Sequence, residues 1–221
     1  MKSKKDYLEP MSLGTNYHQW IYDIIEPYIG HEVCDVGAGL GTFSRLLSDR
    51  ELTIVEIDED RNKALRDQFK KVSYGCLENI EEDNFDTIVY INVLEHILHD
   101  DMELDVVYKK LKTGGYVVIF VPALSILFSK FDRDIGHCRR YGKRLLKNRI
   151  THAGFELVKL RYFDFFGIIP WLIIYKFLRL GMVPSHVRLY DKMVPVFRHI
   201  ERWFKLPIGK NLIVIGKKKA G

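Results

Sequence analysis

The chain has 221 residues, 47% hydrophobic and 29% charged, a globular composition that suits one domain over residues 1–221. Cys34, Cys76 and Cys138 lie far apart without a CxxC spacing, which argues against a disulfide framework and a thiolate metal site. No apolar run approaches the ~18 residues of a membrane-spanning helix, and MKSKKDYLEP lacks a signal segment, so we expect a cytoplasmic protein.

The predicted elements alternate between strands and helices. Residues 1–30 are expected to form an N-terminal helical segment. Brief Val- and Ile-rich runs then predict buried parallel strands at 32–36, 52–57, 72–75, 86–91 and 115–121. Helical spacing marks 42–48, 60–71, 95–99 and 101–111, and Gly114-Gly115 is expected to end the last helix. This alternation is typical of an α/β fold with a doubly wound sheet.

Three glycines follow the first strand in VCDVGAGLGTFS, at Gly37, Gly39 and Gly41. Such a loop lets the backbone approach a ligand at the carboxyl end of a strand, although the glycines could also serve only a tight turn. Glu56 ends the next predicted strand 19 residues after Gly37, where a carboxylate can accept hydrogen bonds from a ribose. Thr42 replaces the third glycine of the dinucleotide fingerprint, which disfavours a nicotinamide cofactor.

Four segments in order, VCDVGAGLG, IVEID, FDTIVYINVLEHI and LKTGGYVVIFVPA, resemble the motifs of class I S-adenosylmethionine-dependent methyltransferases. The resemblance implies a Rossmann-like, mostly parallel seven-stranded sheet with S-adenosyl-L-methionine as cofactor. It implies that the loop 35–41 wraps the methionine part, that Glu56 takes the ribose hydroxyls, and that residues 92–95 lie beside the sulfonium. The cofactor contacts expected on this basis are Asp35, Gly37, Ala38, Gly39, Gly41, Glu56, Ile57, Cys76, Leu77, Asn92 and Val93. Cys76 stands where many relatives carry an acidic residue for the adenine amino group.

The resemblance also implies a sixth and a seventh strand, at 155–163 and 211–218, the last of them antiparallel. Residues 164–210 then form a helical insertion that starts with FFGIIPWLIIYKFLRL. We consider it either a lid or dimer surface that buries these side chains, or an amphipathic element on a membrane. Residues 161–221 hold 12 Lys and Arg against 3 Asp and Glu. This basic tail suits contact with a nucleic acid or with an anionic surface such as the inner face of a membrane, although a basic stretch is more often only a solvated face.

A second insertion, 122–143, is expected on the substrate side and contains SKFDRDIGHCRRYG. Its GHxRRY pattern resembles a bacterial subgroup of small methyltransferases. Arg139 and Arg140, together with Tyr141, can clamp a phosphate or carboxylate, and Asp132 is expected beside them as a substrate contact. His137 is the first candidate for the general base, and Tyr141 and His96 are further candidates. The alternative is that His137 and Tyr141 only fix the loop, with the arginines paired to Asp132 and Asp134.

Together these features predict an enzyme that methylates an oxygen or nitrogen of a small or lipid- or glycan-linked, anionic acceptor, without a metal. A nucleic-acid methyltransferase is disfavoured, because YINVLEH differs from the Asn-Pro-Pro-aromatic motif that grips a flipped base. A regulatory protein that binds the cofactor without catalysis remains an alternative, and the sequence leaves the oligomeric state open.

Overall fold

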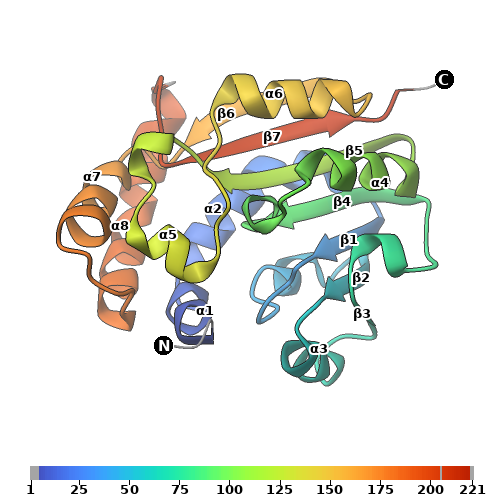
Figure 1. Cartoon of the computed structure of the whole chain (residues 1–221), viewed down its shortest axis with the longest axis horizontal. Coiled ribbons are helices and arrows are strands. Elements are labelled where there is room, and N and C mark those ends of the chain that lie inside the picture. Colours follow the sequence, from blue (N-terminus) through green and yellow to red (C-terminus); the bar gives the residue numbers. More distant parts are fainter. Residues whose placement is uncertain (1–4, 205, 220–221) are drawn as a thin grey trace.

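The structure, a computed structural model, describes residues 5–204 and 206–219. Its centre is a seven-stranded sheet in the order β3-β2-β1-β4-β5-β7-β6 (Figure 1). The strands are β1 (Glu32–Val36), β2 (Glu51–Glu56), β3 (Lys71–Tyr74), β4 (Phe85–Ile91), β5 (Leu111–Pro122), β6 (Glu156–Phe163) and β7 (Asn211–Lys217). The first five pair in parallel, whereas β7 runs antiparallel to both β5 and β6. The predicted doubly wound α/β sheet is confirmed.

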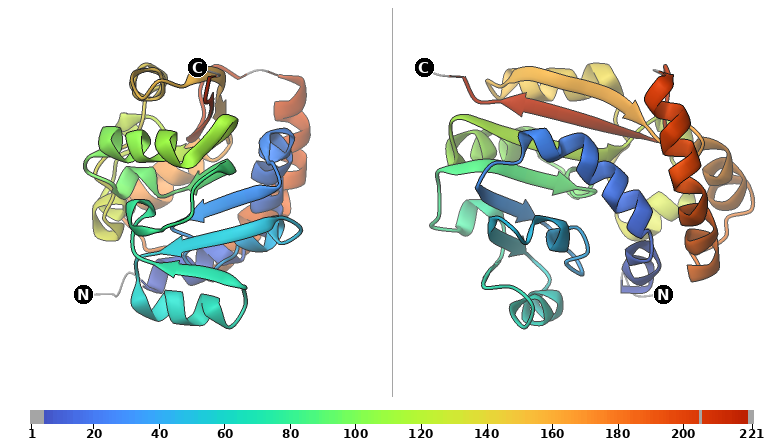
Figure 2. Two further views of the ribbon diagram at one scale, coloured as in Figure 1. Left: turned by 90° about the vertical axis from the view of Figure 1, so that its right-hand side faces the viewer. Right: turned by 180° about the vertical axis from the view of Figure 1, so that it is seen from behind.

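Helices cover both faces of the sheet (Figure 2). They are α1 (Lys5–Ser12), α2 (Thr15–Ile25), α3 (Glu59–Arg66), α4 (Asp100–Lys110), α5 (Lys130–Ile135), α6 (Lys143–His152), α7 (Ile168–Pro170) and α8 (Pro184–Trp203). Alternate residues of each strand point to opposite faces of the sheet, so the apolar strands contribute side chains to two hydrophobic cores, one on each face. One core joins Ile88 and Ile119 to α4 and α6, and the other joins Val89 and Phe120 to α2 and α8.

Several predicted helices are shorter than expected. The segment 42–48 forms only a 3-10 turn, η2 (Ser44–Leu47), and 95–99 only the turn η4 (Leu94–His96). The expected helix end at Gly114-Gly115 is wrong, because α4 ends at Lys110 and both glycines lie within β5. A Cβ on Gly115 would lie 3.0 Å from the backbone oxygen of Asp86. Glycine is therefore needed where β5 passes closely beside β4.

Two insertions extend beyond the end of the sheet to which the parallel strands point, where α1 also lies (Figure 1). The segment after β5 contains α5, and the segment between β6 and β7 contains α7, the π-helical turn η6 (Trp171–Phe177) and α8. Asp191 of α8 accepts hydrogen bonds from the backbone N–H groups of Asn16 and Tyr17, at 3.2 and 2.9 Å, and so caps α2. Among residues 5–204 and 206–219, no helix combines the length and apolar character that crossing a membrane requires.

Candidate functional site

The loop after β1 adopts the left-handed backbone that its glycines permit. The φ angles of Gly37, Gly39 and Gly41 are +71°, +61° and +71°, a region that costs other residues roughly 1–2 kcal/mol each. A Cβ on Gly37 would lie 2.7 Å from Cγ2 of Val93. The loop therefore depends on glycine for its conformation and for its close approach to the end of β4.

Glu56 joins this loop to the end of β2. The side chain is only 3% exposed and accepts hydrogen bonds from the N–H groups of Gly39 and Asp58, at 2.8 and 2.9 Å. The guanidinium of Arg61 lies 3.3 Å from its Oε1 atom. Donors thus surround Glu56 and fix its carboxylate at the edge of the loop.

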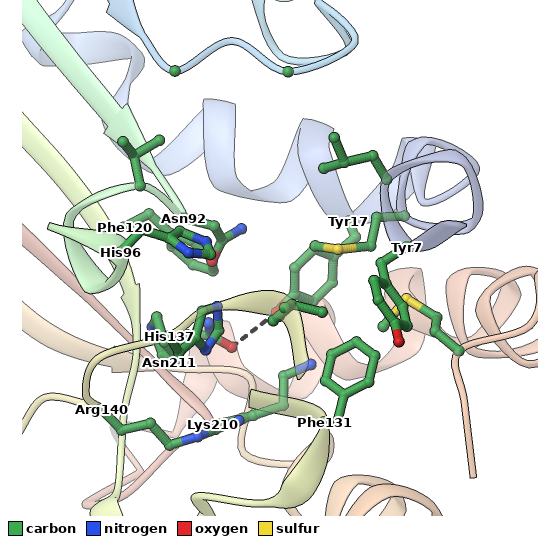
Figure 3. A pocket seen from close by; sticks show the side chains of 18 of the residues that line it. Tyr7, Tyr17, Asn92, His96, Phe120, Phe131, His137, Arg140, Lys210 and Asn211 are labelled. Carbon is green, nitrogen blue, oxygen red and sulfur yellow. Dashed lines mark hydrogen bonds between the residues drawn. The ribbon is translucent and has the colours of Figure 1, made fainter. Parts of the chain in front are cut away.

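A cavity of about 340 Å³ opens at the carboxyl ends of these strands, within the size range of small-molecule sites. Figure 3 shows His96 and His137 along one side of it and Tyr7 and Phe131 along the other. The expected site residues that line it are Gly37, Gly39, Glu56, Ile57, Asn92, Val93, His96, His137 and Arg140. Segments far apart in the sequence therefore meet at one cavity.

Other expected cofactor contacts lie behind the cavity wall or away from it. Asp35 is 2% exposed and accepts a 2.6 Å hydrogen bond from the hydroxyl of Ser44, while burial raises the pKa of Asp35 to about 7. A Cβ on Gly41 would meet Leu65 and Phe69 of the region around α3. Among the described residues, Ala38, Cys76 and Leu77 are also absent from the lining. Leu77 is part of the core, and the Cys76 side chain is exposed.

Asp132 organises the loop that carries His137. Its Oδ1 atom lies 2.9 Å from Nδ1 of His137 and 2.9 Å from Nε of Arg140, and its Oδ2 atom accepts 2.8 Å hydrogen bonds from the backbone and hydroxyl of Ser129. Burial by itself would raise the pKa of Asp132, but these donors hold it below its usual value. Asp132 thus orients His137 toward the cavity without lining it.

The expected clamp of Arg139, Arg140 and Tyr141 does not form. Arg139 pairs with Asp100 at 2.8 Å and donates to the carbonyl of Leu98. Tyr141 is fully buried and donates to Asp100 at 2.8 Å. Burial raises the pKa of Tyr141 well above its ordinary value, and the side chain is absent from the cavity lining. Neighbouring residues in this extended segment point in opposite directions, and only Arg140 faces the cavity.

Glu95 lies between the two histidines and the core. It is fully buried, and burial raises its pKa to about 8. Neither carboxylate oxygen has a hydrogen-bond partner within the described parts of the chain, although Oε1 lies 3.6 Å from Nε2 of His137. The rings of His96 and His137 are edge to face with centroids 4.7 Å apart. The arrangement brings three metal- or proton-binding side chains together, two of them in the cavity wall and Glu95 buried beside them.

A second cavity of about 280 Å³ adjoins the first and lies under the insertion 164–210. Both cavities share Tyr17, Asn92, Trp171 and Lys210 in their walls, along with Met11 and Met182. Apart from Lys210, Asp191, Asn92 and two histidines, the second cavity is lined by apolar, aromatic and glycine residues. The second cavity is therefore suited to binding a largely apolar group.

Several lining residues were not expected from the sequence. They come from α1, α2, α5, the long insertion and the start of β7, and include Tyr7, Leu8, Met11, Tyr17, Phe131, Trp171, Met182, Lys210 and Asn211. Trp171 belongs to the apolar run singled out above, yet its ring lies under Arg140, with the guanidinium carbon 4.4 Å from the ring centroid. Its Nε1–H donates to the carbonyl of Leu127 at 3.1 Å. Aromatic residues in a helical pattern are typical of ordinary core positions. The local sequence therefore did not indicate that these residues would line a cavity.

Comparison with solved structures places the fold. A SAM-dependent methyltransferase from Archaeoglobus fulgidus is 21% identical, with 91% of this chain and 94% of that chain covered and a TM-score of 0.62. A SAM-dependent methyltransferase from Thermotoga maritima is 17% identical, with 93% and 91% covered and a TM-score of 0.60. The [4+2]-cyclase SpnF is 15% identical, with 91% and 80% covered and a TM-score of 0.59. At these identities the likeness concerns the fold, and the cyclase shows that the fold also serves other reactions.

No curated protein sequence matches the chain. The family model described as a methyltransferase domain, however, matches residues 18–160, a span that includes the glycine loop, Glu56, the end of β4 and the His137 loop. With the sheet order, the cavity and this match in agreement, the chain belongs to the methyltransferase domain family.

Proposed function

We propose that the protein transfers a methyl group from S-adenosyl-L-methionine to an oxygen or nitrogen of an amphiphilic, anionic acceptor. The observation that carries this proposal is one continuous cavity wall. The glycine loop, the carboxylate of Glu56 and the imidazole of His137 all border the same space. A binding loop for a nucleoside and a group that can accept a proton are thus adjacent.

The residues present fit this cofactor. The left-handed glycines leave room for a ligand against the backbone. Each oxygen of Glu56 already accepts a backbone hydrogen bond, and a carboxylate oxygen has a second lone-pair direction that suits a ribose hydroxyl. Ile57 is 61% exposed at the cavity and offers an apolar surface for a base. When bound, the cofactor supplies a methyl group already activated by its sulfonium, so positioning of the acceptor contributes much of the rate.

His137 is the group we assign to activation of the acceptor. Asp132 accepts from Nδ1 at 2.9 Å, which leaves the lone pair on Nε2 in the neutral ring. That lone pair can take the proton of a hydroxyl as the new bond to carbon forms, or it can take a proton from an ammonium before the freed amine attacks.

The second cavity supports an acceptor with an apolar body. Trp171, Tyr175 and Tyr190 border it, and Lys210 stands where the two cavities meet. Lys210 is paired with Asp164 at 2.7 Å, and Arg140 with Asp132. An anionic group on the acceptor would share these two cations, with the apolar body held among the aromatic rings.

The test is incubation of the full-length protein with methyl-labelled S-adenosylmethionine and three separate fractions: envelope lipids, RNA and small metabolites. We expect label in the lipid fraction, and we expect its loss with Glu56→Ala. Label in RNA would overturn the acceptor proposal. Tight binding of NAD by calorimetry, with none of S-adenosylmethionine, would overturn the cofactor proposal.

A peripheral membrane position accompanies this acceptor class in our proposal. The insertion 164–210 carries exposed apolar side chains that include Ile169, Ile173, Phe177, Leu178 and Leu180. Exposed basic residues lie in the same segment, among them Arg179, Arg188 and Lys192. Exposed apolar and basic side chains within one segment favour contact with anionic lipid.

A further inference from the structure

We propose that Glu95, His96 and His137 form a binding site for one divalent transition-metal ion, of the zinc or iron(II) type. Glu95 and His96 lie in η4, and His137 follows α5. One ligand atom from each residue lies within 4.8 Å of the other two. Zinc bonds of about 2.0–2.2 Å place tetrahedral ligands about 3.4 Å apart, so small side-chain rotations would close this set around an ion.

Both imidazoles are oriented as metal ligands usually are. Nδ1 of His137 lies 2.9 Å from Oδ1 of Asp132, and Nδ1 of His96 lies 3.1 Å from the carbonyl oxygen of Gly136. Each partner is an acceptor, so each Nδ1 carries the hydrogen and each neutral ring has its lone pair on Nε2. A carboxylate or carbonyl behind the ring is the common second partner of a metal-bound histidine.

Glu95 provides the independent observation. Its side chain is fully buried, and within the described residues neither carboxylate oxygen has a hydrogen-bond partner. A buried polar group without a partner is costly, and in native proteins it often indicates an ion or water that completes its environment. Oε1 of Glu95 and Nε2 of His137 are 3.6 Å apart, too far for a hydrogen bond and close to the spacing of two ligands on one metal.

The local charge admits a cation. The guanidinium of Arg140 offsets the carboxylate of Asp132, and Glu95 would give up its proton on binding the ion, which leaves one anionic ligand for it. Two imidazoles and one carboxylate match the preferences of zinc and of non-haem iron(II), both of which keep open coordination positions in catalytic sites.

The catalytic consequence rests on the proposed function. His96 and His137 line the cavity, so the open positions of the ion would face an acceptor bound there. A hydroxyl oxygen of the acceptor would then bind the ion, which lowers its pKa and lets its proton leave to water. With the ion bound, Nε2 of His137 would be a metal ligand and the ion would activate the acceptor, so direct proton transfer to His137 applies to the protein without the ion.

Cobalt(II) is the probe for this site, because its visible absorption reports the coordination directly. We expect the full-length protein, freed of metal with a chelator, to develop a saturable cobalt band at one equivalent that zinc abolishes. Glu95→Gln conserves shape and removes the anionic ligand, and His96→Ala removes an imidazole. Each should weaken cobalt binding by about tenfold or more, as losses around metal sites do. His152→Ala, which removes an exposed histidine of α6, is the matched control and should bind as wild type does.

Cobalt binding that is absent, or equal in wild type and both variants, would overturn the metal site. Circular dichroism of each variant separates loss of a ligand from loss of the fold. Calorimetry with S-adenosylmethionine on the same samples keeps the two proposals distinct. A cobalt band without cofactor binding would leave the metal site standing and contradict the proposed function, and cofactor binding without a cobalt band would do the reverse.

Discussion

At the scale of single residues, Glu56 allows the cofactor proposal to be tested through the free energy of S-adenosylmethionine binding. A hydrogen bond to a charged group contributes about 1.5–3 kcal/mol, so Glu56→Ala should weaken S-adenosylmethionine binding roughly tenfold to a hundredfold. Calorimetry measures the change. Glu59→Ala is a suitable control, because Glu59 lies three residues further on and is 69% exposed in its pair with Lys63. Unchanged affinity in Glu56→Ala would show that the carboxylate serves only the loop.

His137 is the residue that should separate catalysis from binding. Proton transfer by a positioned side chain typically contributes 10²–10⁴-fold, so His137→Ala should lower turnover about a hundredfold or more. Cofactor affinity should stay near that of wild type, since the glycine loop follows β1 and Glu56 ends β2, whereas His137 lies in the segment between α5 and α6. Single-turnover kinetics and calorimetry on the same variant test this expectation. A parallel loss of both quantities would make His137 a structural residue of the loop.

At the scale of elements, two buried carboxylates attach the insertion 164–210 to the domain. Glu201 of α8 accepts from the backbone N–H groups of Asp164 and Phe165, at 3.2 and 2.7 Å. Asp164 in turn accepts from the hydroxyls of Tyr17 and Tyr190 and pairs with Lys210. The two ends of the insertion and α2 therefore meet in one polar network, and its Tyr17, Tyr190 and Lys210 line the second cavity.

Glu201 should make stability depend on pH. Burial raises its pKa to about 7, so between its ordinary value and pH 7 the folded state holds a proton that the unfolded state has released. The free energy of unfolding must then fall as pH rises through this window, by at most about 1.4 kcal/mol per pH unit from this group. Glu201→Gln removes this contribution. The free energy of unfolding of the variant should therefore rise relative to that of wild type as the pH increases from 5 to about 7.5. Urea unfolding of both proteins across that range tests the sign, and parallel curves would contradict it.

At the scale of the whole molecule, the exposed apolar side chains of the insertion are the feature to test against a membrane. The structure corrects one part of the sequence interpretation, because Trp171 faces the cavity and not the surface. Phe177 and Leu178 are 73% and 59% exposed, and they replace it as the side chains available to lipid.

We expect wild type to sediment with anionic vesicles and to do so less at 1 M salt, where the screening length is about 3 Å. The part of the vesicle binding that comes from burial of apolar side chains should remain at high salt. Phe177→Ala with Leu178→Ala should reduce this binding. The matched control, Leu98→Ala with Met102→Ala, removes two side chains that are each 65% exposed near α4. Equal behaviour of the two double variants, or no binding of wild type, would contradict membrane contact.

The sequence by itself determined the first five strands, whereas the last two were expected from the family resemblance, and it also determined the loop that follows the first strand. Strand positions depend on local runs of Val and Ile, and the left-handed loop depends on glycines at alternate positions, so both were readable without long-range information. The position of Glu56 at the end of β2 followed for the same reason, since parallel strands bring their carboxyl ends to one edge.

Only the tertiary structure decided which polar side chains face the cavity. Arg139, Arg140 and Tyr141 are consecutive. Arg139 and Tyr141 nevertheless bind Asp100, which lies 39 residues before Arg139, and so they do not face the cavity. Glu95 and His137 are 42 residues apart, and no spacing in the sequence brings them within 3.6 Å. Contacts of this kind depend on how two insertions pack against the ends of the strands. Local secondary-structure propensity does not determine which way a side chain points there. The physical reason is that packing among distant segments, rather than the pattern of any one segment, sets the chemistry of this site.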